Sequence, residues 1–274
     1  MNKSFHFGRM IFATAMAGLA VQCMLRGNAV PALEPVSSSS SLPLIGWITG
    51  VVLFAAAVAT LVYSKAYYGA AVIAAMLLLW VLLLHAPALV AAPRNGGEWT
   101  GAFETFALSG AALLLFGLMR SAAGYEREPE PIARRAATIG RIMYGVSMPA
   151  FGVLHFIYIA YVASVIPSWI PAHVFFGYAT GVAHVASGLG ILTGVLSRIA
   201  AYCTAAMFGS WVLIVHAPRV LANFRSPNEW TSMLIAAGMC GGALLIASAL
   251  SNIPNPSASL AESASLESRP TVLA

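Results

Sequence analysis

Eight apolar segments dominate this sequence and constrain its fold more than any other feature. A segment that crosses the hydrocarbon core of a bilayer needs about 20 mostly apolar residues. The predicted spans lie near residues 10–25, 44–63, 67–84, 103–119, 142–166, 174–195, 199–215 and 233–250. Only 8% of the residues are charged, against roughly 25% in soluble domains. The sequence therefore predicts an all-α, multi-pass membrane protein with eight transmembrane helices.

The sequence also contains an internal duplication. The stretch HAPALVAAPRNGGEW begins at His85, and HAPRVLANFRSPNEW begins at His216 with the same spacing of His-Ala-Pro, Arg and Glu-Trp. In the same way, GRMIFATAM at Gly8 matches GRIMYGVSM at Gly140, which opens the fifth span. The first span is therefore predicted to be a retained helix, although its basic start and short apolar run also fit a cleaved signal peptide.

The duplication divides the chain into two parallel repeats, each predicted to be a four-helix bundle. Residues 1–122 form a degenerate first repeat, and residues 140–250 form a clearer second repeat. Residues 123–139 are a charged cytoplasmic linker, and the tail 251–274, rich in Ser, Ala, Pro and Glu, is predicted to be disordered. Because each repeat has four spans, both enter the membrane with the same orientation, and their symmetry axis is predicted to lie along the membrane normal.

Lys and Arg in short loops indicate the orientation, because they accumulate on the cytoplasmic side. With the N-terminus inside, the cytoplasmic side holds ten of them, namely Lys3, Arg9, Lys65, Arg120, Arg127, Arg134, Arg135, Arg141, Arg198 and Arg269. The outer side holds four, namely Arg26, Arg94, Arg219 and Arg225. The sequence thus predicts two cytoplasmic termini and outward-facing HAP…EW loops. The net charge of +5 reflects this topology, which argues against nucleic acid as a partner.

The second repeat resembles a known family. The stretch PAFGVLHFIYIAYVASVIPSWIPAHVFFGYATGVAHVASGLGIL, from Pro149 to Leu192, contains a His-Phe pair, an IPSWIP turn and a TGVAHVASGLGIL helix. In these features it resembles the DoxX family of small four-helix bacterial membrane proteins. The resemblance covers roughly residues 140–248 and implies a multi-pass protein of the bacterial inner membrane. Some members of that family are membrane subunits of thiosulfate:quinone oxidoreductases or of other membrane redox complexes.

The fifth and sixth predicted spans each carry a histidine near the middle of the membrane. His155 and His184 lie at similar depths in helices that run in opposite directions. Gly181 and Gly188 share a face of the sixth helix with His184, and small residues let a neighbouring helix come close. We therefore expect the two imidazoles to meet inside the bundle, with Tyr158 on the same face as His155.

Two neutral imidazoles can ligate a b-type haem, hold another metal or hydrogen-bond a quinone carbonyl. His155, His184 and Tyr158 are therefore the candidate cofactor site, with quinone or b-type haem as candidate ligands. The alternative is that each histidine is a hydrogen-bonded packing residue, because the sequence shows no third ligand beside them. An ionisable group inside a membrane is costly and is a functional candidate for that reason. The first repeat has Cys23 and Leu53 at these positions, so such a site belongs to the second repeat only.

The duplicated loops form a second candidate site. Its members are His85, Arg94, Glu98, Trp99, His216, Arg219, Arg225, Glu229 and Trp230. Under a structural interpretation, the histidines end the third and seventh helices, and the glutamates lie in the first turns that follow, behind Gly97 and Asn228 as N-caps. The tryptophans suit the membrane interface. Under a functional interpretation, the same residues form an outward-facing polar cluster for an anionic head group, a quinone or a side chain of a partner protein.

Three classes of function remain open at this point. The first, which we favour, is a membrane subunit of a redox-associated or quinone-associated inner-membrane complex, with the lipid bilayer and other membrane or redox subunits as partners. The second is a structural subunit without a cofactor, and the third is a carrier of small solutes or lipids. Glu104 is the only carboxylate expected inside a span, which disfavours a carrier. Sequence motifs of nucleotide loops, zinc proteases, serine hydrolases and zinc-binding cysteines are missing, so we expect an accessory subunit rather than a self-sufficient enzyme.

Overall fold

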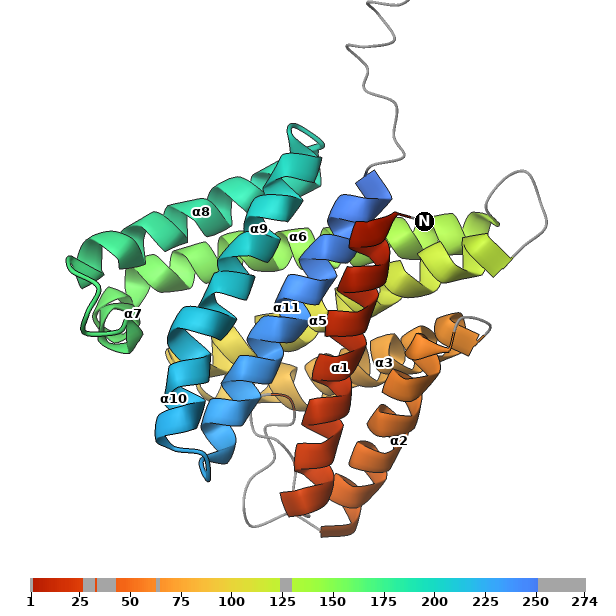
Figure 1. The fold of residues 1–274 in the computed structure, drawn as a ribbon, viewed down its shortest axis with the longest axis horizontal. Coiled ribbons are helices and arrows are strands. Elements are labelled where there is room, and N and C mark those ends of the chain that lie inside the picture. The colour runs from red at the N-terminus through yellow and green to blue at the C-terminus, as the bar shows by residue number, and fades with distance from the viewer. Residues whose placement is uncertain (1, 27–32, 34–42, 63–64, 124–129, 251–274) are drawn as a thin grey trace, which may run out of the picture.

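The computed structural model describes residues 2–26, 33, 43–62, 65–123 and 130–250, and every regular element within them is a helix. This confirms the prediction of an all-α fold. The first half contains α1 (Lys3–Arg26), α2 (Pro43–Leu61), α3 (Ala66–Trp80), α4 (Ala86–Ala91) and α5 (Gly96–Ala123). The second half contains α6 (Pro131–Ile157), α7 (Ile159–Val165), α8 (His173–Thr193), α9 (Ser197–Trp211), α10 (Ala217–Ala222) and α11 (Pro227–Leu250) (Figure 1).

Two short π-helical turns occupy matched places in the two halves. The turn η2 (Val81–His85) joins α3 to α4, and the turn η3 (Val212–His216) joins α9 to α10. Each π-turn therefore lies inside one continuous helical run. These runs extend over Ala66–Ala91 and Ser197–Ala222.

Among the described residues, six helical runs are long and apolar enough to cross a membrane: Lys3–Arg26, Ala66–Ala91, Gly96–Ala123, His173–Thr193, Ser197–Ala222 and Pro227–Leu250. The prediction of eight spans is therefore wrong by this measure. α6 and α7 make a seventh span only if they are counted together, because the chain bends by 95° between them. The bend lies at Tyr158, whose φ of −107° and ψ of 34° leave the helical region. The apolar part of α2, Gly46–Leu61, is too short to qualify.

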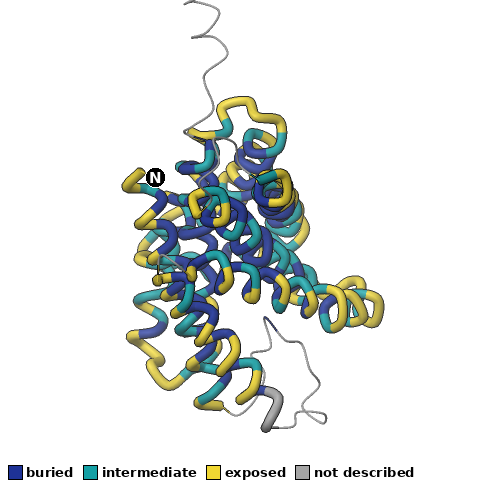
Figure 2. Tube along the Cα trace, turned by 90° about the vertical axis from the view of Figure 1, so that its right-hand side faces the viewer, coloured by how far each residue is buried: buried dark blue, intermediate teal, exposed yellow. Residues whose placement is uncertain are grey.

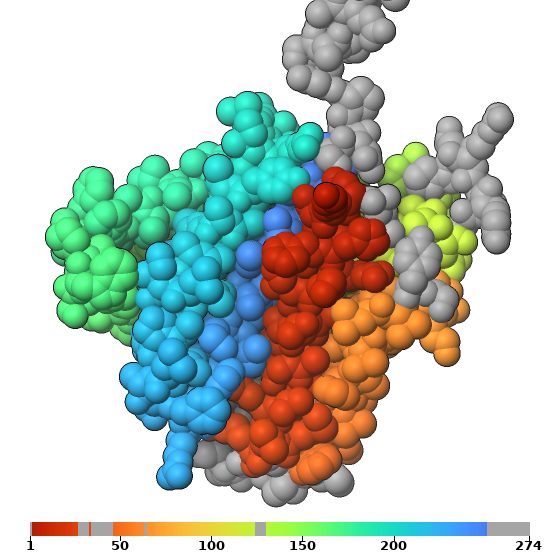
Figure 3. All heavy atoms as spheres, in the orientation of Figure 1, coloured from red at the N-terminus to blue at the C-terminus, as the bar shows by residue number. Residues whose placement is uncertain are grey.

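Neighbouring helices pack into one closed ring that includes both halves. In chain order, α1 packs on α2, α2 on α3, α3 on α5, α5 on α6, α6 on α8, α8 on α9 and α9 on α11. The ring closes because α11 packs on α1, and α11 also contacts α5. The last long helix of each half thus packs on the first helix of the other half, and Figure 3 shows α11 between α1 and α9 on one face of the molecule.

The two contacts between the first helix of one half and the last long helix of the other depend on matched glycines. A Cβ on Gly8 of α1 would lie 2.9 Å from the carbonyl oxygen of Gly241 of α11. A Cβ on Gly140 of α6 would overlap the carbonyl oxygen of Gly110 of α5. Close approach of two helix backbones therefore requires glycine at these four positions. In the duplication, Gly8 corresponds to Gly140 and Gly110 to Gly241, so the two contacts are built in the same way.

The surface of the ring is apolar where a bilayer would contact it. Figure 2 shows buried positions inside the assembly of helices and exposed positions along their outward faces. Large apolar side chains such as Leu83, Val90, Phe175 and Leu213 are more than half exposed. Many large exposed apolar side chains are unusual for a soluble protein and suit contact with lipid tails.

Polar connections gather at two opposite ends of the molecule. In Figure 1 the start of α1, the ends of α5 and α11 and the start of α6 lie toward the upper right. α10 lies toward the lower left, and α7 and the start of α8 lie at the left edge. Connections that the sequence assigns to the same side of a membrane therefore lie at the same end.

Candidate functional site

His85 and His216 do not end their helices, so this part of the sequence prediction is wrong. Each is the last residue of a π-helical turn, and the helix continues through α4 or α10 to Ala91 or Ala222. Proline lacks a backbone N–H, and its ring clashes with the carbonyl four residues earlier in a regular α-helix. The wider π-turn before Pro87 accommodates that ring, so the proline widens the helix without ending it.

The buried His85 ring links three parts of the first half. Its Nε2 lies 3.1 Å from the carbonyl oxygen of Leu33 and 3.1 Å from Oγ1 of Thr105 on α5. Its Nδ1 is buried without a hydrogen-bond partner among the described residues. In the second half, Ala236 replaces Thr105, and the buried Nδ1 of His216 also has no described partner. The hydrogen-bonding role of this histidine is therefore found in the first half only.

The loop polar cluster forms an ion pair in the second half only. Arg219 Nε lies 2.8 Å from Oε2 of Glu229, and its NH2 group donates to Oε1 at 3.0 Å. This two-pronged contact is the geometry in which Arg binds a carboxylate most strongly. In the first half, Ala88 stands in place of Arg219, and Glu98 makes no ion pair within the described residues. Arg94 and Arg225, predicted members of the cluster, are exposed and form no ion pair within the described residues.

The tryptophans and helix starts are organised by local hydrogen bonds. Trp99 Nε1 donates to the carbonyl of Pro93, and Trp230 Nε1 donates to that of Phe224, both at 2.9 Å. The predicted N-caps are wrong, because both helices begin before them. α5 begins at Gly96, and the Asn95 side chain accepts a hydrogen bond from Gly97 N–H. α11 begins at Pro227, so Asn228 lies within its first turn.

The predicted meeting of His155 and His184 is confirmed. Their ring centroids lie 5.0 Å apart, with His155 on α6 and His184 on α8. A Cβ on Gly181 would lie 3.1 Å from the Cβ of His155, so the missing side chain lets the two helices approach closely. This is the role that the small residues of α8 were predicted to have.

Three aromatic side chains surround the histidine pair. The Trp211 ring lies 6.1 Å from His155 and 5.5 Å from His184, measured between centroids. Phe208 and Phe151 lie 5.6 Å and 5.5 Å from His184. The sequence did not predict Phe208 and Trp211 at this site, although Trp211 repeats Trp80 in the duplication and was a usable signal. The pair thus lies in an aromatic cage contributed by α6, α8 and α9.

The hydrogen bonds of the two imidazoles differ. His155 Nδ1 lies 2.8 Å from the carbonyl oxygen of Phe151, which can only accept, so Nδ1 carries the proton and Nε2 is an acceptor. His184 is 1% exposed, and its Nδ1 has no partner among the described residues. Because buried polar atoms are nearly always hydrogen-bonded, an atom without a partner points to a ligand or a bound water.

Tyr158 does not belong to the histidine pair, contrary to the prediction. It lies at the break between α6 and α7, and its hydroxyl donates to the carbonyl of Arg94 at 2.8 Å. A Cβ on Gly96 would overlap the Tyr158 ring closely, at 2.6 Å. The residue therefore joins the break in the second half to the turn before α5. The prediction failed because it assumed that one straight helix continues through residue 158.

A cleft lies between α8 and α9, and His184 is next in sequence to one of its walls without lining it. Its volume is about 280 Å³, and its walls are Ala179, Thr180, Ala183, Ser187, Cys203, Thr204 and Met207. His184 is adjacent in sequence to Ala183, and Phe208, which packs on His184, is adjacent to Met207. Matched positions in the first half carry larger or less polar residues, among them Ile73 for Thr204 and Ala56 for Ser187. Small and polar residues therefore keep this cleft open in the second half.

The histidine pair does not fit a haem placed between its rings. Two imidazoles that bind one iron from opposite faces, each through a bond of about 2 Å, have centroids roughly 6 Å apart with the macrocycle between them. The observed 5.0 Å separation and 59° angle are those of two rings in direct contact. Within the described residues, no group of three His, Cys, Asp or Glu side chains could hold a metal ion.

Comparison with known proteins corrects the resemblance proposed from sequence. A family model described as a domain of unknown function, DUF8561, matches residues 144–252. The match runs from within α6 to the end of α11 and includes both His155 and His184. The assignment to the DoxX family is wrong, because the family that matches is a different one. No curated protein and no solved structure matches this chain.

Proposed function

We propose that this chain is a multi-pass protein of the bacterial inner membrane, built from two four-helix repeats of the same orientation. Six apolar helical runs support membrane insertion. The matched π-turns and matched glycine contacts support the repeat. The grouping of connections at two ends fits the excess of Lys and Arg on one side, with both termini cytoplasmic (Figure 1).

We further propose that the second half binds a lipophilic quinone in the cleft between α8 and α9. The observation that carries this proposal is the buried Nδ1 of His184, which has no described partner and belongs to the residue that follows Ala183, a wall of that cleft. The first half has Leu53 at this position and needs no ligand there. A volume of about 280 Å³ is at the small end of the pockets that bind organic ligands.

The chemistry of the cleft suits a ring that bears carbonyl groups. A quinone carbonyl can accept a hydrogen bond from a protonated nitrogen of His184, and the free Nε2 of His155 can accept one from a quinol hydroxyl. Phe208 and Trp211 provide aromatic faces against which a flat ring can pack. Ser187 and Thr204 donate their hydroxyl protons to carbonyls of their own helices and are left as acceptors.

On this proposal the chain is an accessory subunit. It supplies a quinone site to a larger membrane assembly, and a partner subunit supplies the electrons. A structural subunit without a ligand is the alternative, and it is favoured if the purified protein fails to bind quinone.

Titration of the purified full-length protein in lipid nanodiscs with a short-chain ubiquinone analogue tests the quinone proposal. His184→Leu copies the first half and should weaken binding at least tenfold without lowering the melting temperature. The matched control is His173→Leu, at the start of the same helix, which should bind like the native protein. Native-like quinone binding by His184→Leu would show that the cleft is not the quinone site.

A further inference from the structure

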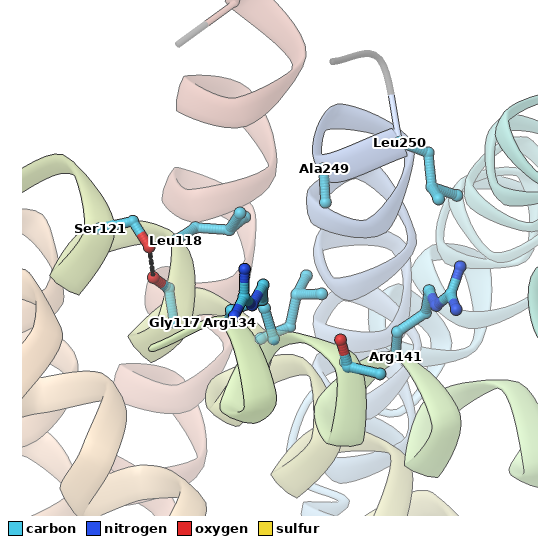
Figure 4. A pocket seen from close by; sticks show the side chains of 10 residues that line it. Gly117, Leu118, Ser121, Arg134, Arg141, Ala249 and Leu250 are labelled. Carbon is cyan, nitrogen blue, oxygen red and sulfur yellow. Dashed lines mark hydrogen bonds between the residues drawn. The ribbon is translucent and has the colours of Figure 1, made fainter. Parts of the chain in front are cut away.

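A second cleft lies where α5 and α11 end and α6 begins (Figure 4). Its volume is about 280 Å³, and its walls are Leu114, Gly117, Leu118, Ser121, Arg134, Ala137, Thr138, Arg141, Ala249 and Leu250. Most of this lining is apolar, and both charged members are arginines. The proposed quinone site uses none of the residues that line this cleft.

Arg134 and Arg141 present two free guanidinium groups along one side of the cleft. They are two helical turns apart on α6, which puts them on the same face of that helix. Neither forms an ion pair or a side-chain hydrogen bond within the described part of the chain. Arg120 of α5 differs, because its Nε lies 2.8 Å from Oε2 of Glu130. Among the described residues, the cleft therefore combines positive charge that no ion pair neutralises with an apolar wall.

The matched region of the first half is filled by the chain itself. Phe5 replaces Ala137 and is 1% exposed, and Asn2 replaces Arg134. Asn2 Oδ1 accepts hydrogen bonds from Ser248 Oγ and from the backbone N–H of Phe5, both at 3.0 Å. Arg9, the counterpart of Arg141, is 9% exposed and lies 6.0 Å from the Phe5 ring. Among the described residues, the space beside the start of α6 is therefore open, and the matched space beside the start of α1 is filled.

We propose that this cleft binds one anionic phospholipid, with its phosphate between Arg134 and Arg141 and an acyl chain along Leu114, Leu118 and Leu250. Arginine binds phosphate through paired, charge-assisted hydrogen bonds. Cytoplasmic membrane surfaces carry anionic lipids, which basic residues at helix ends attract. The apolar wall explains why a lipid, rather than a free anion, fits the site, because a free phosphate leaves that wall exposed.

Thermal unfolding of the full-length protein in mixed micelles tests the proposal. Phosphatidylglycerol should raise the melting temperature, and phosphatidylcholine with the same acyl chains should not. Arg134→Gln and Arg141→Gln should each weaken lipid binding. The phosphatidylglycerol concentration that gives half of the rise in melting temperature should increase roughly tenfold in each variant. Arg135→Gln, which removes the same charge from a neighbouring position outside the cleft, should keep the native response.

Three further measurements separate a lipid from other occupants. Inorganic phosphate should not reproduce the rise, and Ala137→Phe, which copies Phe5, should abolish it. Deletion of residues 251–274 should leave the response unchanged. Equal stabilisation by both lipids, an unaltered response in the Arg134→Gln, Arg141→Gln double variant, or loss of the response on deletion of the tail would each overturn the proposal.

Discussion

The two halves of the chain share a backbone plan and differ in the side chains at matched positions. Both have a π-turn ahead of a proline, and both pack a first helix on a last helix through glycine. Where the second half has His184 and Thr204, however, the first has Leu53 and Ile73. At positions that line the clefts, the first half has larger apolar side chains, such as Ile73 in place of Thr204 and Phe5 in place of Ala137.

This difference indicates that helix packing and the proposed ligand binding depend on separate residues. The glycines that set helix separation are present in both halves, so the scaffold does not require the histidine pair. Few changes therefore suffice to open or close a cleft on one backbone. Phe5 against Ala137 is the clearest case, because one benzyl group fills the space that the other half leaves open. Substitutions at matched positions test whether the two halves differ in this way.

The largest effect is expected at the glycine contacts that the halves share. Gly140→Leu and Gly241→Leu each place a side chain against the backbone of a neighbouring helix, and overpacking of this kind costs roughly 1–3 kcal/mol or more. Both variants should melt well below the native protein in detergent. Gly209→Ala is the control, because its Cβ would lie 3.5 Å from Cys240 Sγ, at ordinary contact distance. A native melting temperature for either leucine variant would contradict the matched-contact description.

A smaller effect, unequal between the halves, is expected at the π-turn histidines. His85→Leu leaves Thr105 and the Leu33 carbonyl without this partner inside the protein, which costs about 1–3 kcal/mol. His216→Leu removes a ring whose Nδ1 has no described partner, so the loss of stability should be smaller. Denaturant unfolding of both variants measures the difference. Equal destabilisation would show that the two turns do not differ in the way described.

The smallest effect is expected at the ion pair that only the second half has. Arg219 is 41% exposed and Glu229 is 19% exposed, measured on their side chains, so solvent screens much of their attraction. A double-mutant cycle with Arg219→Ala and Glu229→Ala should give about 0.2–1 kcal/mol, and less at high salt. Ala88→Arg should create the same pair with Glu98 and gain a similar amount. No coupling in either half would mean that the contact does not contribute to stability.

The sequence predicted the helices better than it predicted the membrane spans. A helix lies near every predicted span, because apolar length is a strong signal. Hydropathy could not reveal the bend at Tyr158, since the residues on both sides of it are equally apolar. His85 and His216 were interpreted as helix ends, because a π-turn that accommodates the following proline depends on tertiary packing.

The candidate site was only partly predictable. His155 and His184 were paired correctly, because counting residues in antiparallel helices gives their depth in the membrane. Phe208 and Trp211 were missed because they lie on a third helix, whose rotation cannot be obtained from one sequence. The DoxX assignment failed because short Gly, Ala and His motifs recur in unrelated apolar helices.

The central claim is that only the second half binds a lipophilic ligand beside His184. Photolabelling with an azido-quinone in native membranes, followed by peptide mapping, tests it most directly. The label should fall on residues 173–222, compete with unmodified quinone and disappear in His184→Leu. Equal labelling of residues 43–91, or labelling that persists in His184→Leu, would contradict the claim.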